Sequence, residues 1–451
     1  MASSSEKTAL YRMLWRWHFY AGLFVMPMVL VLSLTGALYL FKPQIERWEE
    51  RAFQGLAVAG AVAPSAQRDA ALAAFPGAAF HSYRLPGRSG DAALIHIALP
   101  GDKGMRDVFV SPQGDVVGSI DPEWRIMQIA HDIHGQLLLG PRGSWLVELA
   151  ASWAIVMIAT GLYLWWPRGR GAAGVLWPRL KQEPRVLWRD LHAVTGFWVS
   201  GLALVLLVTG LPWAGVWGSS FKTVREQMGW VKGAQDWTIG GRAPGASEDA
   251  GEHALHAEHD HSAMMTGASH HHAHPAPDRL NAIVDKAQAE HLPFPVIVTP
   301  PGAPQAFGAK AGPTWTVRSD TQDRPRRITI RYDAAGAQEV SRDTFADKHV
   351  IDRVVGYGIA WHEGALFGWV NQLIGLLTAF ALVALSVTGF IQWRRRKPQG
   401  GLGVPPAPRA PARSAAVLAI GGFFFLTLPL FALSLSAIWL IDRIGRRTLS
   451  T

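Results

Sequence analysis

The chain has 451 residues, of which 49% are hydrophobic and 17% are charged, with 20 tryptophans and no cysteine. The lack of cysteine excludes disulfides, thiolate-bound iron–sulfur clusters, covalent haem attachment through C-x-x-C-H and thiol catalysis. The net charge of +9 raises the question of nucleic acid, but the basic residues cluster beside the ends of apolar segments, which is typical of a membrane protein.

Five apolar segments are long enough to cross a hydrocarbon core of about 30 Å, which takes roughly 20 helical residues. The first follows a basic N-terminus, as in a signal peptide, but it is too long and lacks a small-residue cleavage site, so we expect it to be retained. The sequence predicts a polytopic α-helical membrane protein with spans at residues 19–41, 144–166, 192–216, 366–393 and 414–441.

The charges between the spans predict the orientation. Basic residues precede the first span, fill the loop between the second and third spans, and follow the fourth. By the positive-inside rule these segments are cytoplasmic, and the long polar segments lie outside. Arg443, Arg446 and Arg447 of the C-terminal tail are an exception to this rule. The predicted cytoplasmic segments are residues 1–18, 167–191 and the Gly- and Pro-rich linker 394–413; the external domains are 42–143 and 217–365; the tail is 442–451.

Each external segment contains one helical run followed by four alternating, strand-like runs. This order predicts two small α+β modules, each with one helix and a short antiparallel sheet. The helices are expected at residues 65–74 and 278–290, and the strands at 81–84, 92–98, 107–110 and 116–120 and, in the second module, near 296–299, 314–318, 328–332 and 338–342.

Histidines and glycines recur at fixed spacings along the spans. The interval from His18 to Gly36 equals the interval from His192 to Gly210. In a second pair, the interval from His134 to Gly161 equals the interval from His362 to Gly389, and both glycines follow a threonine. We interpret the chain as two copies of one unit, related by a pseudo-two-fold axis along the membrane normal. The fifth span has no counterpart and is interpreted as an appended helix.

This symmetry predicts that His18 faces His192 near the cytoplasmic face and that His134 faces His362 near the outer face. Two neutral imidazoles facing across a helical bundle are the axial ligands of a b-type haem, which needs no cysteine. The repeated histidine-to-glycine spacing covers about 27 Å of helix, which brings the span-end glycines to the level of the opposite histidines. Glycine gives a flat macrocycle room, so we expect two haems b whose contacts include Gly22, Gly196, Gly36, Gly210, Gly161 and Gly389.

Simpler interpretations exist for each of these residues. A single histidine at a span end is often interfacial, and glycines often serve helix packing; four histidines in two equally spaced pairs favour ligation. His131 shares a helical face with His134 and is an alternative ligand or supporting partner, although its counterpart is Ile359. Arg16 and Arg189 are either propionate partners or ordinary positive-inside residues.

An insertion at residues 240–277 is rich in histidine, glycine, alanine, serine and proline, a composition typical of disorder. It either binds Cu, Zn, Ni or iron loosely, with Met264 and Met265, or is an incidental low-complexity run. Its histidines are His253, His256, His259, His261, His270, His271, His272 and His274.

At these residues the chain resembles the PepSY-associated transmembrane family, iron-regulated membrane proteins that include ferric-siderophore reductases of the bacterial inner membrane. The matching pieces are Trp17-His18-Phe19-Tyr20-Ala21-Gly22, His134-Gly135-Gln136-Leu137-Leu138-Leu139-Gly140, Leu191-His192-Ala193-Val194-Thr195-Gly196 and the Thr-Gly span ends. The resemblance covers roughly residues 14–396 and implies two periplasmic PepSY domains over a di-haem bundle, with His18, His134, His192 and His362 as ligands. The insertion and the fifth span depart from the family pattern.

The resemblance implies an inner-membrane oxidoreductase, with its N-terminus cytoplasmic and its large domains periplasmic, that carries electrons outward to a ferric siderophore or other ferric chelate. No G-x-G-x-x-G follows a strand, so the electron donor is expected to be a quinol or a redox partner protein. Two alternatives stay open. The chain is a metal or siderophore transporter or permease component, for which Glu148 is nearly the only intramembrane carboxylate, or a PepSY binding module on a membrane anchor without redox activity.

Overall fold

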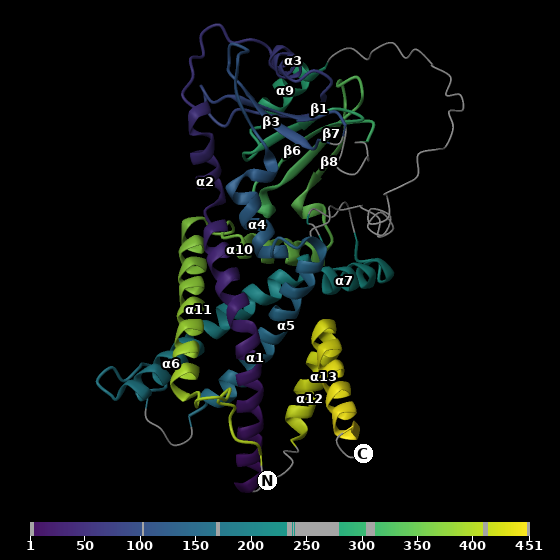
Figure 1. Cartoon of the computed structure of the whole chain (residues 1–451). Coiled ribbons are helices and arrows are strands. Elements are labelled where there is room, and N and C mark those ends of the chain that lie inside the picture. Colours follow the sequence, from purple (N-terminus) through teal and green to yellow (C-terminus); the bar gives the residue numbers. More distant parts are fainter. Residues whose placement is uncertain are drawn as a thin grey trace.

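The computed structural model describes residues 4–101, 103–167, 172–231, 237, 239, 279–303, 312–408 and 414–448. It contains a bundle of long apolar helices with an antiparallel sheet above one end (Figure 1). We call this end of the bundle the sheet end. The opposite end, where the loop 167–183 joins two long helices, is the loop end. The insertion 240–277 lies outside the described residues.

Within the described residues, four helices are long and apolar enough to cross a membrane. They correspond to the first four expected spans: α1 (Ser4–Tyr39), α5 (Gly140–Trp165), α6 (Pro184–Gly210) and α11 (Trp369–Arg396). α1 packs against α5 and α11, and α6 packs against α11 and α5. α1 contains Pro27 without ending there, which is tolerated where neighbouring helices pack around the freed backbone groups.

The fifth apolar segment differs from the single helix that its composition predicts. It forms α12 (Ala415–Thr427) and α13 (Pro429–Thr448), and the helix direction bends by 115° between them. Pro429 has no N–H to continue the first helix and its ring disfavours a helical Leu428 before it, so the chain breaks there. α12 and α13 lie side by side, and both the start of α12 and the end of α13 lie at the loop end (Figure 1).

The polar segments together form one eight-stranded antiparallel sheet. Its strands are β1 (Ala79–Arg84), β2 (Ala93–Ala98), β3 (Met105–Val110), β4 (Val116–Ile120), β5 (Val296–Thr299), β6 (Trp315–Ser319), β7 (Ile328–Tyr332) and β8 (Glu339–Thr344), all close to their expected bounds. Their order is β4-β3-β2-β1-β5-β6-β7-β8. The sequence predicts a separate short sheet in each segment, but the structure joins them because β1 pairs with β5, with Tyr83 opposite Val298 and Arg84 opposite Ile297.

Two helices, α3 (Pro64–Ala74) and α9 (Leu280–Ala289), cover the face of the sheet that points away from the bundle (Figure 1). Alternate strand residues such as Ile95, Val317 and Ile330 are fully buried beneath them. Because strand side chains alternate between faces, the residues between these positions point toward the bundle. This second face combines charged residues with a small apolar cluster, in which Leu94 and Phe109 pack against Phe53 of η1.

Short helices connect the sheet to the bundle. α2 (Lys42–Glu49) and η1 (Glu50–Phe53) continue upward from α1, and Pro43 fits the first turn of α2. α4 (Ile126–Gln136) and α10 (Val350–His362) lie between the sheet and the long helices (Figure 1). The remaining elements are η2 (Pro122–Trp124), η3 (Leu211–Trp213), α7 (Gly215–Gln227), η5 (Arg324–Arg326) and η6 (Phe345–Asp347).

Candidate functional site

Four histidines from four helices meet in two pairs. His18 of α1 and His192 of α6 have ring centroids 6.5 Å apart, with their planes at 82°. His134 of α4 and His362 of α10 have centroids 6.2 Å apart, at 81°. We call them the loop-end pair and the sheet-end pair. The structure therefore brings together the residues that the repeated spacing pairs, and their role as haem ligands stays a prediction.

The ring separations fit one metal ion between the members of each pair. Two metal–nitrogen bonds of about 2 Å and two ring radii of about 1 Å place the centroids of opposing imidazoles about 6 Å apart. The observed separations are 6.5 Å and 6.2 Å. Each pair could give a metal one nitrogen from each ring, which leaves its other coordination positions to another ligand, as in haem with two axial histidines.

The other ring nitrogen of each histidine is engaged by a neighbouring helix. In the loop-end pair, Nδ1 of His18 lies 3.1 Å from the carbonyl oxygen of Met157, and Nδ1 of His192 lies 3.2 Å from that of Leu385. A carbonyl oxygen only accepts hydrogen bonds, so in both rings Nδ1 carries the hydrogen. Nε2 is then left with its lone pair, which is the form that binds a metal.

The sheet-end histidines are neutral at physiological pH. Burial, followed by the nearby His362 and His131, lowers the pKa of His134 to about 3. Burial also lowers the pKa of His362 to about 4. A neutral imidazole has a lone pair for a metal ion, whereas a protonated one has none. Trp213 packs edge-on against the ring of His362, with centroids 5.4 Å apart.

The four span-end glycines lie against the imidazoles. A Cβ atom on Gly161 would lie 3.0 Å from Cε1 of His18, and one on Gly36 would lie 3.1 Å from Cε1 of His134. The corresponding distances are 3.4 Å from Gly210 to His362 and from Gly389 to His192. The sequence predicts that these glycines leave room for a haem. In the structure they make room for the histidine rings.

The other two candidate glycines have a different environment. A Cβ atom on Gly22 would lie 3.7 Å from Sδ of Met157, and one on Gly196 would lie 3.5 Å from Cδ2 of Leu385. Both distances are ordinary van der Waals contacts. Gly22 and Gly196 therefore let α1 and α6 approach the neighbouring spans at the level of the loop-end pair.

The two candidate propionate arginines have protein partners. Arg16 donates to the carbonyl oxygen of Pro405 at 2.8 Å. Arg189 forms an ion pair of 2.8 Å with Asp190, whose fully buried carboxylate also binds Arg179. These contacts hold the segments next to the membrane at the loop end. They agree with the simpler interpretation, in which both arginines are ordinary positive-inside residues.

His131 and Glu148 have roles outside the histidine pairs. Nδ1 of His131 lies 3.1 Å from the Asp132 carboxylate, and its ring faces Tyr39. The carboxylate of Glu148 accepts hydrogen bonds from the backbone N–H groups of Val216 and Trp217, at 2.8 and 3.1 Å. These are N-terminal N–H groups of α7, which otherwise have no partner within the helix. Glu148 is therefore a helix cap that joins α5 to α7.

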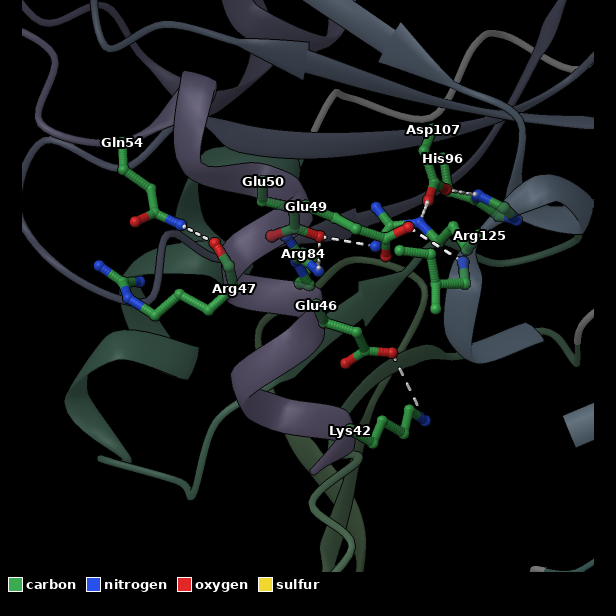
Figure 2. A network of polar contacts seen from close by, with 11 residues as sticks. Lys42, Glu46, Arg47, Glu49, Glu50, Gln54, Arg84, His96, Asp107 and Arg125 are labelled. Carbon is green, nitrogen blue, oxygen red and sulfur yellow. Dashed lines mark hydrogen bonds and ion pairs between the residues drawn. The ribbon is translucent and has the colours of Figure 1, made fainter. Parts of the chain in front are cut away.

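A polar network fixes the start of α4, the helix that carries His134 (Figure 2). Glu49 of α2 accepts a hydrogen bond from the first N–H of α4, at Ile126, over 2.9 Å. Arg125 lies between two carboxylates, 2.9 Å from Glu50 and 3.0 Å from Asp107. The network continues to Arg84 on β1 and His96 on β2. α4 is thus attached both to the extension of α1 and to the sheet.

We expect the Arg125→Ala variant to lose up to about 3–5 kcal/mol of folding free energy, because two buried carboxylates each lose one of their two basic partners. Burial raises the pKa of Asp107, but His96 and Arg125 hold it below its ordinary value. The stability from Asp107 is therefore present above its ordinary pKa of about 3.9 and is lost as the pH falls below it. Denaturant titrations of the detergent-solubilised protein at several pH values measure both effects, and the variant should show a shallower acid dependence.

Arg331→Ala is the matched control, because the Arg331–Asp343 pair on the other half of the sheet is exposed to solvent. Exposed pairs contribute about 0–1 kcal/mol. Equal destabilisation by the two substitutions would contradict the role given to the buried network.

Comparison with protein families gives one finding about the chain as a whole. The model of the PepSY-associated TM region matches residues 15–396, while no curated protein matches the chain. The match begins at Trp15, shortly before His18, and ends with α11 at Arg396. It includes both histidine pairs, the sheet and the four long helices, and it excludes α12 and α13.

Proposed function

The chain belongs to the PepSY-associated TM region family of membrane proteins, and from that premise we propose that it is a di-haem b electron carrier. In this proposal it passes electrons across the bacterial inner membrane to a ferric chelate, such as a ferric siderophore, and releases the more weakly held ferrous ion. The donor is a quinol or a redox partner protein. The observation that carries the proposal is the pair of facing, Nδ1-anchored histidines at each end of the bundle.

Each residue then has a defined role. His18 and His192 would hold one haem at the loop end, and His134 and His362 would hold the other at the sheet end. When bound, haem b supplies an iron that takes up and gives back one electron. The helical stretch from His18 to Gly36 on α1 separates the two levels by about 27 Å, most of the hydrocarbon thickness. The two sites thus divide the membrane into shorter electron-transfer steps.

We also propose that the chain arose by duplication of a two-span unit. The sheet order supports this interpretation, because β1 and β5 pair at the centre and the later strands of each half follow outward in sequence order. The Nδ1 contacts support it as well. His18 contacts Thr160 as His192 contacts Thr388, and His134 contacts Thr35 in the way that His362 contacts Thr209.

In the proposed orientation the loop end is cytoplasmic and the sheet is periplasmic. Arg179 and Lys181, between α5 and α6, and the three arginines that end α11 lie at the loop end. The bend at Leu428 returns α13 to this same end. Arg443, which counts against the positive-inside rule if the fifth segment is one span, then follows the rule.

The alternatives explain less of the geometry. A transport path needs ionisable groups facing a passage, whereas the carboxylate of Glu148 caps α7. A binding module on an anchor gives no reason for the neutral, facing rings within the apolar bundle. The redox proposal explains both histidine pairs in the same way, because each pair would bind one haem.

The deciding experiment is the dithionite-reduced minus oxidised absorbance spectrum of the purified protein in detergent, with haem counted by pyridine haemochrome. We expect a b-type spectrum and two haems per chain. The reduced protein should then be reoxidised by a ferric chelate, with ferrous iron appearing in a colorimetric trap. A colourless protein from cells with adequate haem supply would refute the proposal.

Deleting residues 240–277 should leave haem content and the reoxidation rate within about twofold of the full chain. The reason is that both histidine pairs and their Nδ1 contacts lie outside this segment. The measurement is stopped-flow reoxidation of the reduced protein by the same ferric chelate. A loss of reoxidation with both haems retained would instead place the histidine-rich segment at the substrate.

A further inference from the structure

The Thr-Gly dipeptide at the end of each long helix places a threonine hydroxyl against one of the four histidines. Oγ1 of Thr35 lies 3.0 Å from Nδ1 of His134, and Oγ1 of Thr209 lies 3.1 Å from Nδ1 of His362. The other two distances, from Thr160 to His18 and from Thr388 to His192, are both 3.2 Å. All four contacts join one helix to another.

The direction of these hydrogen bonds follows from the threonines' other contacts. Each hydroxyl also lies within hydrogen-bond distance of the carbonyl oxygen one turn earlier in its own helix, which can only accept. The single hydroxyl hydrogen is therefore donated to that carbonyl, and the oxygen is an acceptor toward the imidazole. The distances are 2.8 Å from Thr35 to Val31, 3.0 Å from Thr160 to Val156, 2.7 Å from Thr209 to Val205 and 2.7 Å from Thr388 to Ala384.

We propose that Thr35, Thr160, Thr209 and Thr388 are positioning residues that fix the tautomer and the ring orientation of the four histidines and tune the redox potential of each haem. This inference rests on the proposed function. Each threonine accepts the Nδ1 hydrogen, which leaves Nε2 with the lone pair that binds a metal. An acceptor at Nδ1 increases the basicity of the ligand and favours the ferric state, in the way that outer partners tune other histidine-bound metals.

The glycine that follows each threonine leaves room for the same histidine ring. A Cβ atom at Gly36 would lie 3.1 Å from Cε1 and 3.5 Å from Nδ1 of His134. A side chain at position 36 would press against the ring of His134 while it contacts the hydroxyl of Thr35, and glycine avoids this tight contact. Threonine supplies the acceptor and glycine supplies the space, which explains why the two recur together.

The two ends of the bundle differ in how far they depend on threonine. At the loop end, the carbonyl oxygens of Met157 and Leu385 lie as close to Nδ1 as the threonines do. At the sheet end, the threonine hydroxyls lie closer to Nδ1, at 3.0 and 3.1 Å, and the carbonyl oxygens of Leu32 and Leu206 are further acceptors. Removing a hydroxyl should therefore change the sheet-end haem more than the loop-end haem.

α11 supplies a matched control. Thr378 is 2% exposed and Thr388 is 7% exposed, and both donate to the carbonyl one turn earlier, at 2.7 Å. Only Thr388 of these two contacts a histidine in the described part of the chain. Thr378→Val thus tests the effect of losing a buried hydroxyl from the same helix without touching a ligand.

The experiment is a spectroelectrochemical titration of full-length holoprotein carrying Thr209→Val, Thr388→Val, Thr378→Val or the conservative Thr209→Ser. We expect Thr209→Val to shift the midpoint potential of one haem to a more positive value and to weaken its binding about 10–100-fold. Thr388→Val should have a smaller effect on the other haem. Thr209→Ser should restore wild-type behaviour, and Thr378→Val should match the wild type.

The outcomes separate this inference from the proposed function. Wild-type protein without haem would refute the proposed function itself. Wild-type protein with two haems, combined with potentials in Thr209→Val that equal those of Thr378→Val, would overturn the role of the threonines alone. A uniform shift of both haems in all variants, Thr378→Val included, would likewise overturn it, because a general change of stability would then explain the data.

Discussion

Replacing His134 by alanine is expected to remove one of the two haems and to leave the other with its wild-type spectrum. His134 contacts Thr35 and faces His362, and neither residue touches the loop-end pair. Loss of one axial nitrogen leaves the sheet-end iron with a single protein ligand. Pyridine haemochrome analysis should fall from about two haems per chain to about one, since the two sites lie about 27 Å apart along the helices.

The control for this substitution is His131→Ala, one turn earlier on the same helix. His131 contacts Asp132 and Tyr39, not the sheet-end partner, so its removal should retain both haems. His18→Ala, His192→Ala and His362→Ala complete the series, and each should remove one haem. Full haem content in all four variants would show that the facing rings are not ligands.

The second large effect is expected from Gly161→Leu. Even the Cβ atom of a side chain at this position would lie 3.0 Å from Cε1 of His18. His18 cannot move away without losing the hydrogen bonds of its Nδ1 to Met157 and Thr160. Overpacking of this kind costs about 1–3 kcal/mol, and a displaced ring no longer points Nε2 at His192. The loop-end haem should be lost or bound at least about tenfold more weakly, since about 1.4 kcal/mol is a factor of ten in affinity.

Gly201→Leu on α6 provides the comparison, because a Cβ atom there meets nothing within 4 Å. It adds the same apolar side chain to a long helix of the bundle at a site with space. Haem content, read by absorbance after purification in the same detergent, should stay at two per chain. Similar losses in the two leucine variants would mean that the glycine does not protect the position of His18.

Much of this arrangement could be predicted from the sequence. Helical and strand periodicities located the four long helices and all eight strands, because both depend on local patterns of apolar residues. The equal spacing in the two halves also identified which histidines meet. His18 and His192 lie far apart in the chain, so composition alone could not pair them, whereas the repeat did.

Three features were not predicted, and the first two depend on contacts that no local pattern encodes. β1 joins β5 through Tyr83 and Val298, and alternation along a strand does not say which strand lies beside it. The glycines' neighbours are rings from other helices, which composition cannot identify. The bend at Leu428 had a local signal in Pro429, but the apolar run around it is long enough for a single span. A proline near the middle of such a run is a reason to consider a hairpin.

The continuity of the sheet has a mechanical consequence. α4 follows the last strand of the first half of the sheet, and α10 follows the last strand of the second half. Both sheet-end histidines are therefore connected to the same eight-stranded sheet. The loop-end rings, on α1 and α6, are instead spaced by the packing of the bundle itself. The spacing of the sheet-end rings therefore depends on the continuity of the sheet as well as on the packing of α4 and α10 against the long helices, whereas the spacing of the loop-end rings depends on the long helices alone.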